Sequence, residues 1–353
     1  MLGTVAAATL VALAALAPDR RPSLSEERDR YAELSSGSGW KAAVDRFQGT
    51  RRPLAFVVGV VRKFNDDQAG KLAALIAYYG FFSLFPALLA LTTSLGFVLE
   101  RHPDLRRRIE DSALGQFPVI GSSIGSLQQP LSGNVFALVL GLLGAVWAGM
   151  GAIQAAQDAM NGVWDVARVD APSFLKKRLR SLATLALIVV PLLANVIVPS
   201  LVGGFTGGVG TWVLVTVASL VVDVGVFAVA FRVLTAVPQT WRIVWPGACI
   251  AAVGYVLLQS LGALYVQHVL AGAEDTYGTF GVVIGLLSWM YLLARMVVLA
   301  AEVNVVRARR LWPRSLFSDP VTQADRRSQA AQAEEAEISG AERIDVSFDA
   351  GYS

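Results

Sequence analysis

Charge is what this sequence has little of. Only 16% of its 353 residues are charged, whereas 54% are hydrophobic, and soluble domains carry about 25% charged residues. The charges are also gathered in short clusters, with long uncharged stretches between them. This pattern argues against an ordinary soluble domain and indicates a membrane protein.

Histidine and cysteine are also scarce, with two histidines and the single cysteine Cys249. One cysteine cannot form an intramolecular disulfide. A hydrolytic nuclease needs a metal-binding cluster or an acid–base pair at a phosphate, and the sequence offers neither. It also contains no Walker-type, HExxH or GxSxG motif. We therefore expect no enzyme activity, no catalytic or metal-ligating residues and no cofactor.

The uncharged stretches are long enough to cross a bilayer, for which about 20 apolar residues suffice. Residues 72–99 contain no charge, and residues 181–222 could supply two spans joined by the turn GGFTGGVG at 203–210. The sequence therefore predicts an all-α polytopic membrane protein with six transmembrane helices, preceded by an interfacial helix on the cytoplasmic side. The expected spans are about 74–98, 135–157, 181–202, 211–231, 243–268 and 278–302.

The distribution of Lys and Arg predicts the orientation of these spans. With six spans, 25 basic residues fall on one side and four on the other, and Arg295 lies within the last span. The positive-inside rule then places both termini in the cytoplasm. Basic clusters such as KKRLR at 176–180 are explained as topology determinants and contacts with anionic lipid headgroups, so we expect membrane lipids and no nucleic acid as partners. The oligomeric state is left open.

The remaining segments flank the membrane domain, which we place at 72–312. Residues 1–39 combine the apolar segment Met1–Ala17 with a charged, disordered extension; the segment is either an extra weak anchor or an unstructured start. Residues 40–71 are basic with a short apolar run, and we interpret them as an interfacial amphipathic segment. Residues 313–353 are predicted to be a disordered acidic cytoplasmic tail.

The first span has two different faces. Tyr79, Ser83, Pro86 and Thr93 share one side of the helix, and aromatic residues, including Phe82 and Phe85, occupy a second stripe. Pro86 cannot donate a backbone hydrogen bond, so a kink is expected there. The polar face is either the wall of a cavity with a hinge or an ordinary helix-packing surface.

Two ionisable residues fall within predicted spans, where charge is costly. Asp223 lies roughly 16 Å and Arg295 roughly 21 Å along their helices from the outer surface. We expect the two to pair, either as a substrate or proton site or as a structural clamp. Glu302 and Asn304 lie lower, at the inner boundary, and Glu302 shares a face with Arg295.

Four segments in order resemble the YihY/BrkB family of bacterial inner-membrane proteins. They are DDQAGKLAALIAYYGFFSLFPALLAL (66–91), WAGMGAIQAAQDAMNGVWDV (147–166), VPQTWRIVWPGA (237–248) and TYGTFGVVIGLLSWMYLLARMVVLAAEVN (276–304). The motif residues are Trp147, Asn161, Trp164, Pro238, Pro246 and Gly247. Two positions depart from the family pattern: Ala300 replaces a signature glycine, and Arg295 stands where an apolar residue is expected.

The resemblance implies six helices and a location in the bacterial cytoplasmic membrane, but little chemistry, because the ribonuclease label once given to such proteins is regarded as misassigned. We expect a protein that translocates or handles an amphipathic envelope component, a lipid or lipid-linked molecule. Two alternatives stay open. One is an ion- or proton-coupled exchanger of small solutes that uses Asp223, and the other is a non-transporting envelope assembly or scaffold protein.

Overall fold

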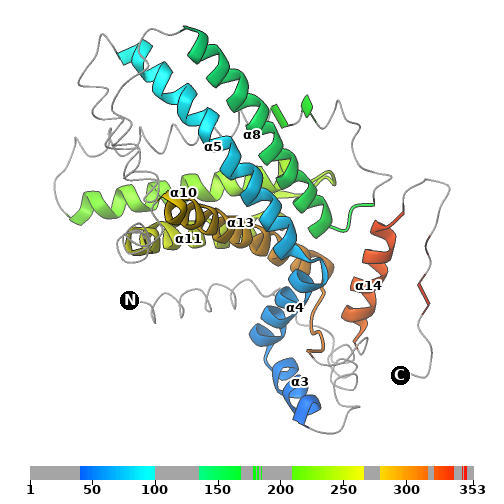
Figure 1. Ribbon diagram of the computed structural model, residues 1–353. Coiled ribbons are helices and arrows are strands. Elements are labelled where there is room, and N and C mark those ends of the chain that lie inside the picture. The colour runs from blue at the N-terminus through cyan, green and yellow to red at the C-terminus, as the bar shows by residue number, and fades with distance from the viewer. Residues whose placement is uncertain are drawn as a thin grey trace.

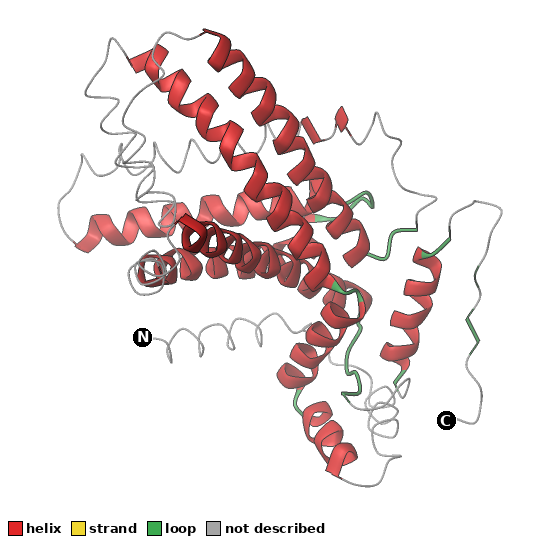
Figure 2. Cartoon of the chain, viewed as in Figure 1, coloured by secondary structure: helices red, strands yellow, loops and turns green. Residues whose placement is uncertain are grey.

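In the part of the chain that it describes, the computed structural model consists of helices joined by loops, without a strand (Figure 2). That part comprises residues 40–99, 135–167, 209–265, 279–316 and 322–337, with isolated positions at 178–184 and 344–347. The helices are α3 (Trp40–Thr50), α4 (Arg52–Asp66), α5 (Ala69–Leu99), α8 (Val135–Val163), α10 (Val209–Leu234), α11 (Trp241–Tyr265), α13 (Thr279–Arg309) and α14 (Gln323–Glu335).

Five of these helices are long and apolar enough to cross a membrane, namely α5, α8, α10, α11 and α13. The chain is therefore a polytopic helical membrane protein. The predicted third span, 181–202, lies almost wholly outside the described residues, as do residues 1–39. The count of six spans accordingly stays a prediction.

The five long helices form two groups (Figure 1). One is the pair α5 and α8, which lie side by side along much of their length. The other contains α10, α11 and α13, in which α11 packs against both of its neighbours. Because α13 also contacts α5, α8 and α4, it connects the two groups.

Small residues allow the helices to approach closely, as is usual in membrane proteins. On α8, a Cβ added at Gly141 would lie 2.9 Å from the backbone nitrogen of Ala90 on α5, and one added at Gly144 would lie 3.0 Å from Pro86. Between α11 and α13, a Cβ at Gly247 would lie 2.3 Å from the backbone oxygen of Ala300. Glycine is therefore required at these contacts by space.

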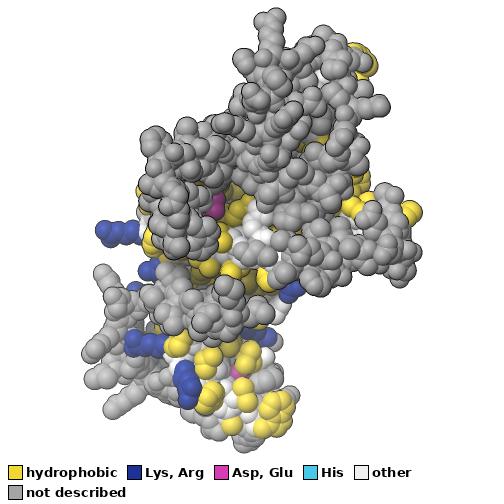
Figure 3. Space-filling model, turned by 90° about the vertical axis from the view of Figure 1, so that its left-hand side faces the viewer, with side chains coloured by type: hydrophobic (Ala, Val, Ile, Leu, Met, Phe, Trp, Pro, Cys, Tyr) yellow, Lys and Arg dark blue, Asp and Glu magenta, His cyan; other side chains and the backbone are white. Residues whose placement is uncertain are grey.

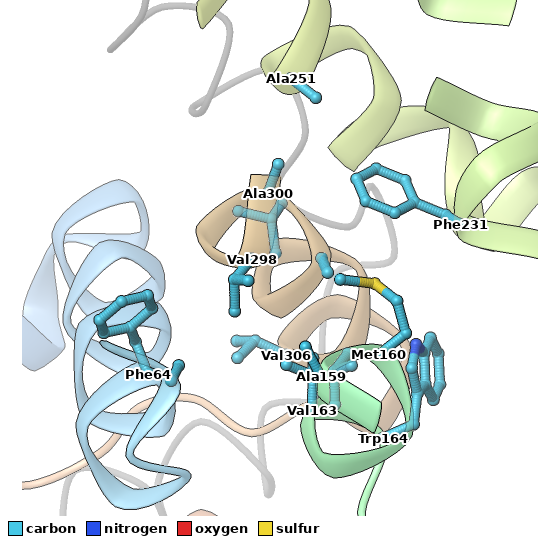
Figure 4. Close-up of a cluster of buried hydrophobic side chains, with 14 of the residues drawn as sticks. Phe64, Ala159, Met160, Val163, Trp164, Phe231, Ala251, Val298, Ala300 and Val306 are labelled. Carbon is cyan, nitrogen blue, oxygen red and sulfur yellow. The ribbon is translucent and has the colours of Figure 1, made fainter. Parts of the chain in front are cut away.

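The apolar core lies where α4, α8 and α13 meet at one end of the bundle (Figure 4). Val163 of α8 and Val306 of α13 are fully buried there, and Phe64 of α4 reaches the same cluster. We call this end the base of the bundle. It is the end at which α5 begins and α8 and α13 finish, so three chain segments distant in sequence converge there.

The segment before the first span forms α3 and α4. The face of α4 formed by Ala55, Phe56, Gly59 and Val60 is buried. Gly59 is close to the backbone oxygen of Leu311, and Phe56 meets Trp312 edge to face at 6.2 Å between ring centroids. The helix thus packs on the end of α13, and an interfacial position for it stays a prediction.

The expectation of a disordered tail from residue 313 is wrong for 313–316 and 322–337. Thr322 and Asp325 form a capping box that starts α14. Arg314 is buried between Asp325, at 2.7 Å from its Nε, and Asp66 of α4, at 2.7 Å from a terminal nitrogen. Ion pairs and a helix cap stabilise this segment. A search of the sequence for apolar residues does not detect interactions of this kind.

Candidate functional site

The structure does not bring Asp223 and Arg295 together. The guanidinium of Arg295 lies over the ring of Phe64 on α4, 5.5 Å from its centroid, and its side chain is exposed. Asp223 is buried on α10, where its charge acts on Tyr255 of α11. The physical reason is that α11 packs between α10 and α13, so the two predicted partners stand on helices that are not neighbours.

This arrangement predicts independent effects for the two charges. Asp223→Asn and Arg295→Leu should change the thermal stability of the detergent-purified protein additively, within about 0.5 kcal/mol, because separate sites without shared partners add. A double-mutant cycle of thermal unfolding measures this. A coupling energy well above that limit would mean that the pair exists after all.

The polar face of α5 meets α8. The ring of Tyr79 covers Gly151, Pro86 lies against Gly144, and Thr93 is buried. Ser83 and Thr93 donate hydrogen bonds to carbonyls of their own helix, to Gly80 at 2.6 Å and Leu89 at 2.7 Å. These are the contacts of a packed helix pair, and the role of cavity wall and hinge stays a prediction.

Two asparagines, the motif residue Asn161 and the inner-boundary residue Asn304, accept hydrogen bonds from backbone of other elements. Asn161 on α8 accepts a hydrogen bond from the backbone nitrogen of Ala236 after α10, at 2.8 Å. Asn304 on α13 accepts one from the backbone nitrogen of Gly247 on α11, at 2.7 Å. Gly247 directly follows Pro246, a proline inside α11, where the ring disturbs the hydrogen bonding of the helix backbone. Of the other motif residues, Trp164 is buried and Trp147 and Pro238 are exposed.

The strongest concentration of buried charge lies at the base, around Lys63 of α4. The side chain of Lys63 is fully buried, and its ammonium contacts three acceptors. It donates to Asp67, to Asp165 Oδ1 at 3.0 Å and to the carbonyl of Val163 at 3.2 Å. A lysine has three N–H donors, so those of Lys63 are all used.

Asp165 is shared between two cations. Its other oxygen accepts from Arg309 of α13 at 2.6 Å, and Arg309 also donates to the carbonyl of Trp164 at 2.6 Å. Asp165 has a φ of 46°, in the left-handed region that terminates helices and that aspartate tolerates better than most residues. The end of α8 is thereby tied to both α4 and α13.

Glu302 completes the set, which we call the base cluster: Lys63, Asp67, Asp165, Glu302 and Arg309. Glu302 is fully buried on α13 and interacts electrostatically with Lys63, Asp67 and Asp165. Gln332 of α14 donates to Asp67 Oδ1 at 3.0 Å, so the C-terminal helix also reaches the cluster. Within the described part of the chain, no group of His, Cys, Asp and Glu is arranged to hold a metal ion.

The electrostatics of the cluster shift two pKa values outside the spans. Burial lowers the pKa of Lys63, but the charges of Glu302, Asp67 and Asp165 outweigh it, so the pKa is raised above 10.5. Burial raises the pKa of Asp67 above 3.8, and the charge of Asp165 adds to this against the opposing effect of Lys63. Both shifts favour the state with the proton bound.

The raised pKa of Lys63 predicts a loss of stability in alkali. Its contribution is complete below its unfolded pKa of about 10.5 and is lost as the pH rises through the higher folded value. The difference in thermal stability between the natural protein and Lys63→Met should therefore be constant between pH 8 and 10 and shrink above about pH 10.5. A difference that grows above pH 10.5 would contradict the assignment of Lys63 to the cluster.

Sequence reasoning found Glu302 but missed Lys63, Asp67, Asp165 and Arg309. A usable signal was present: the three carboxylates lie in segments that resemble the family, at the start of one span and at the ends of two others. The predicted topology puts these three span ends, and with them the three carboxylates, on the same side of the membrane. The search for charge at membrane depth drew attention to Asp223 and Arg295 instead.

Comparison with known proteins places the chain in a family. Residues 60–319 match the family described as Virulence factor BrkB. Putative ribonuclease-like protein YfkH of Bacillus subtilis (strain 168) is 25% identical over 271 residues, which are 73% of this chain and 96% of that protein. Inner membrane protein YhjD of Escherichia coli (strain K12) is 23% identical over 273 residues, 71% of this chain and 80% of that protein. No solved structure matches. Because the match covers most of the chain, the protein belongs to the virulence factor BrkB family.

Proposed function

We propose that this protein is a multi-pass inner-membrane protein that translocates or handles an amphipathic envelope component, a lipid or lipid-linked molecule. The observation that carries this is an exposed aromatic stripe on α5 together with exposed basic residues on the helices that precede it. Tyr78, Phe82 and Phe85 are each at least half exposed on α5. Below them, exposed Arg51 and Arg52 lie at the junction of α3 and α4.

This surface matches the chemistry of an amphipathic anion. Figure 3 shows Lys and Arg side chains next to hydrophobic ones in the lower half of the molecule, where α3 and α4 lie. Aromatic rings offer wide apolar contact for acyl chains, and exposed guanidinium groups attract anionic headgroups. A site for a small inorganic ion would not require an exposed aromatic stripe.

Reconstitution tests the proposal. In liposomes containing a headgroup-labelled anionic phospholipid, the purified full chain should make inner-leaflet label accessible to an impermeant quencher faster than in protein-free liposomes. Phe82→Ala should slow this, whereas Leu143→Ala, which truncates a side chain on α8 that is 65% exposed, should not. Label movement at the protein-free rate would overturn the proposal. Ion or proton flux without lipid movement would favour the ion- or proton-coupled exchanger. Absence of both lipid movement and ion flux would favour the assembly or scaffold protein.

We also propose that both termini lie in the cytoplasm, which puts the base on the cytoplasmic side. Cysteines introduced at Gly207 and Thr276 into a variant without Cys249 should react with an impermeant thiol reagent from outside whole cells. Cysteines at Arg178 and at the exposed Thr240, next to Gln239, should react only after the membrane is opened. The opposite labelling pattern would reverse the orientation.

A further inference from the structure

The base cluster has more negative than positive groups. Its carboxylates are Asp67, Asp165 and Glu302, and its cations are Lys63 and Arg309. An uncompensated charge in a buried site is costly, and the site reduces this cost by binding a counter-charge. A single proton would make the cluster neutral.

The hydrogen bonds of the cluster show which carboxylate lacks a donor. Both oxygens of Glu302 are buried and have no hydrogen-bond partner among the described residues. Lys63 has no donor left for it, because its three N–H groups go to Asp67, Asp165 and Val163. Arg309 donates to Asp165 and to the carbonyl of Trp164.

The other described polar residues around Glu302 supply no donor to it either. On the same helix, α13, Asn304 accepts a hydrogen bond from the backbone of Gly247 on α11, and Arg295 lies over Phe64 of α4. Gln332 of α14 donates to Asp67 and leaves Glu302 unserved. Asp67, by contrast, has lone pairs to spare, since each carboxylate oxygen can accept two hydrogen bonds.

We propose that Glu302 and Asp67 form a proton-binding carboxyl pair at the base, in which Glu302 holds one proton and donates it in a hydrogen bond to Asp67. The proton adds to a carboxylate oxygen of Glu302 and comes from water, and no other bond changes. Burial and the charge of Asp165 raise the pKa of Asp67, and both effects therefore favour binding of a proton by the pair. The pair joins α13 to the turn between α4 and α5, so its protonation bears directly on the connection between the two helix groups.

Infrared spectroscopy tests the pair independently of any transport activity. The full chain in detergent at neutral pH should show the carbonyl stretching band of a protonated carboxyl, shifted in D2O. Glu302→Gln should lose this band, whereas Asp223→Asn, which alters a buried carboxylate outside the cluster, should keep it. A band unchanged in Glu302→Gln, or no band in the natural protein, would overturn the proposal.

Stability gives a second, separate readout. Glutamine has the shape and neutral charge of protonated glutamate, so Glu302→Gln should fold and should unfold at the same temperature as the natural protein at neutral pH. Glu302→Ala, which leaves Asp67 without the donor, should unfold at a lower temperature. Failure of Glu302→Gln to fold would contradict the proposal that Glu302 is neutral. An infrared band that stays unchanged in this variant would contradict it equally.

Discussion

Replacement of Gly247 by alanine is expected to destabilise the protein more than any other single methyl group added to the bundle. The new Cβ would lie 2.3 Å from the backbone oxygen of Ala300 and 2.5 Å from the amide nitrogen of Asn304. A backbone oxygen cannot rotate away, so α11 and α13 would have to separate, and the hydrogen bond from Gly247 to Asn304 would be lost. Overpacking of this kind costs about 3 kcal/mol.

Gly225 on α10 supplies the matched control. A Cβ added there has no atom within 4 Å, and alanine is favoured over glycine in a helix by about 0.8–1 kcal/mol. Thermal unfolding in detergent should therefore show Gly225→Ala unchanged or stabilised and Gly247→Ala strongly destabilised. Equal behaviour of the two variants would mean that α11 and α13 are not in the described contact.

Asp165→Asn is expected to have the second large effect. The side chain of Asp165 is fully buried between Lys63 and Arg309, and loss of its charge leaves Lys63 with fewer counter-charges in a buried site. Breaking a buried ion pair costs about 3–5 kcal/mol, and we expect about 3 kcal/mol because Lys63 keeps Asp67. Asparagine tolerates the left-handed backbone as well as aspartate does, so the change isolates the charge.

Asp158→Asn controls for the loss of a carboxylate near the end of α8. Asp158 is exposed, seven residues before Asp165, and surface substitutions usually stay within about 0.5 kcal/mol. Thermal unfolding of the two variants should differ by several degrees. If Asp165→Asn were as stable as Asp158→Asn, the cluster would contribute nothing to the base.

The long helices were readable from the sequence because a single property, the absence of charge over about 20 residues, determines them. The windows that we expected at 74–98 and 211–231 lie within α5 and α10 as described. The interior of α13 tolerates Arg295 because that side chain reaches Phe64 of α4. Depth along a helix could be counted from the sequence, and such counts gave the similar levels of Asp223 and Arg295.

The packing of one helix beside another could not be predicted from the sequence in the same way. Whether Asp223 faces Arg295 depends on which helix packs beside which, and α11 between α10 and α13 is a property of the assembled bundle. The base cluster was missed for a related reason: Lys63 and Asp165 are 102 positions apart, and neither stands out locally. In α14 the only local signal was the capping pair Thr322 and Asp325.

The central claim is that this membrane protein translocates a lipid. We expect that movement to depend on the carboxyl pair at the base, because α13, which carries Glu302, connects the two helix groups, and not to depend on Asp223 of α10. The most direct measurement compares Asp67→Asn with Asp223→Asn, reconstituted at equal protein content, in the assay of labelled-lipid translocation. The account predicts that Asp67→Asn falls to the protein-free rate, whereas Asp223→Asn keeps the rate of the natural protein. Loss of translocation in Asp223→Asn with full activity in Asp67→Asn would contradict it.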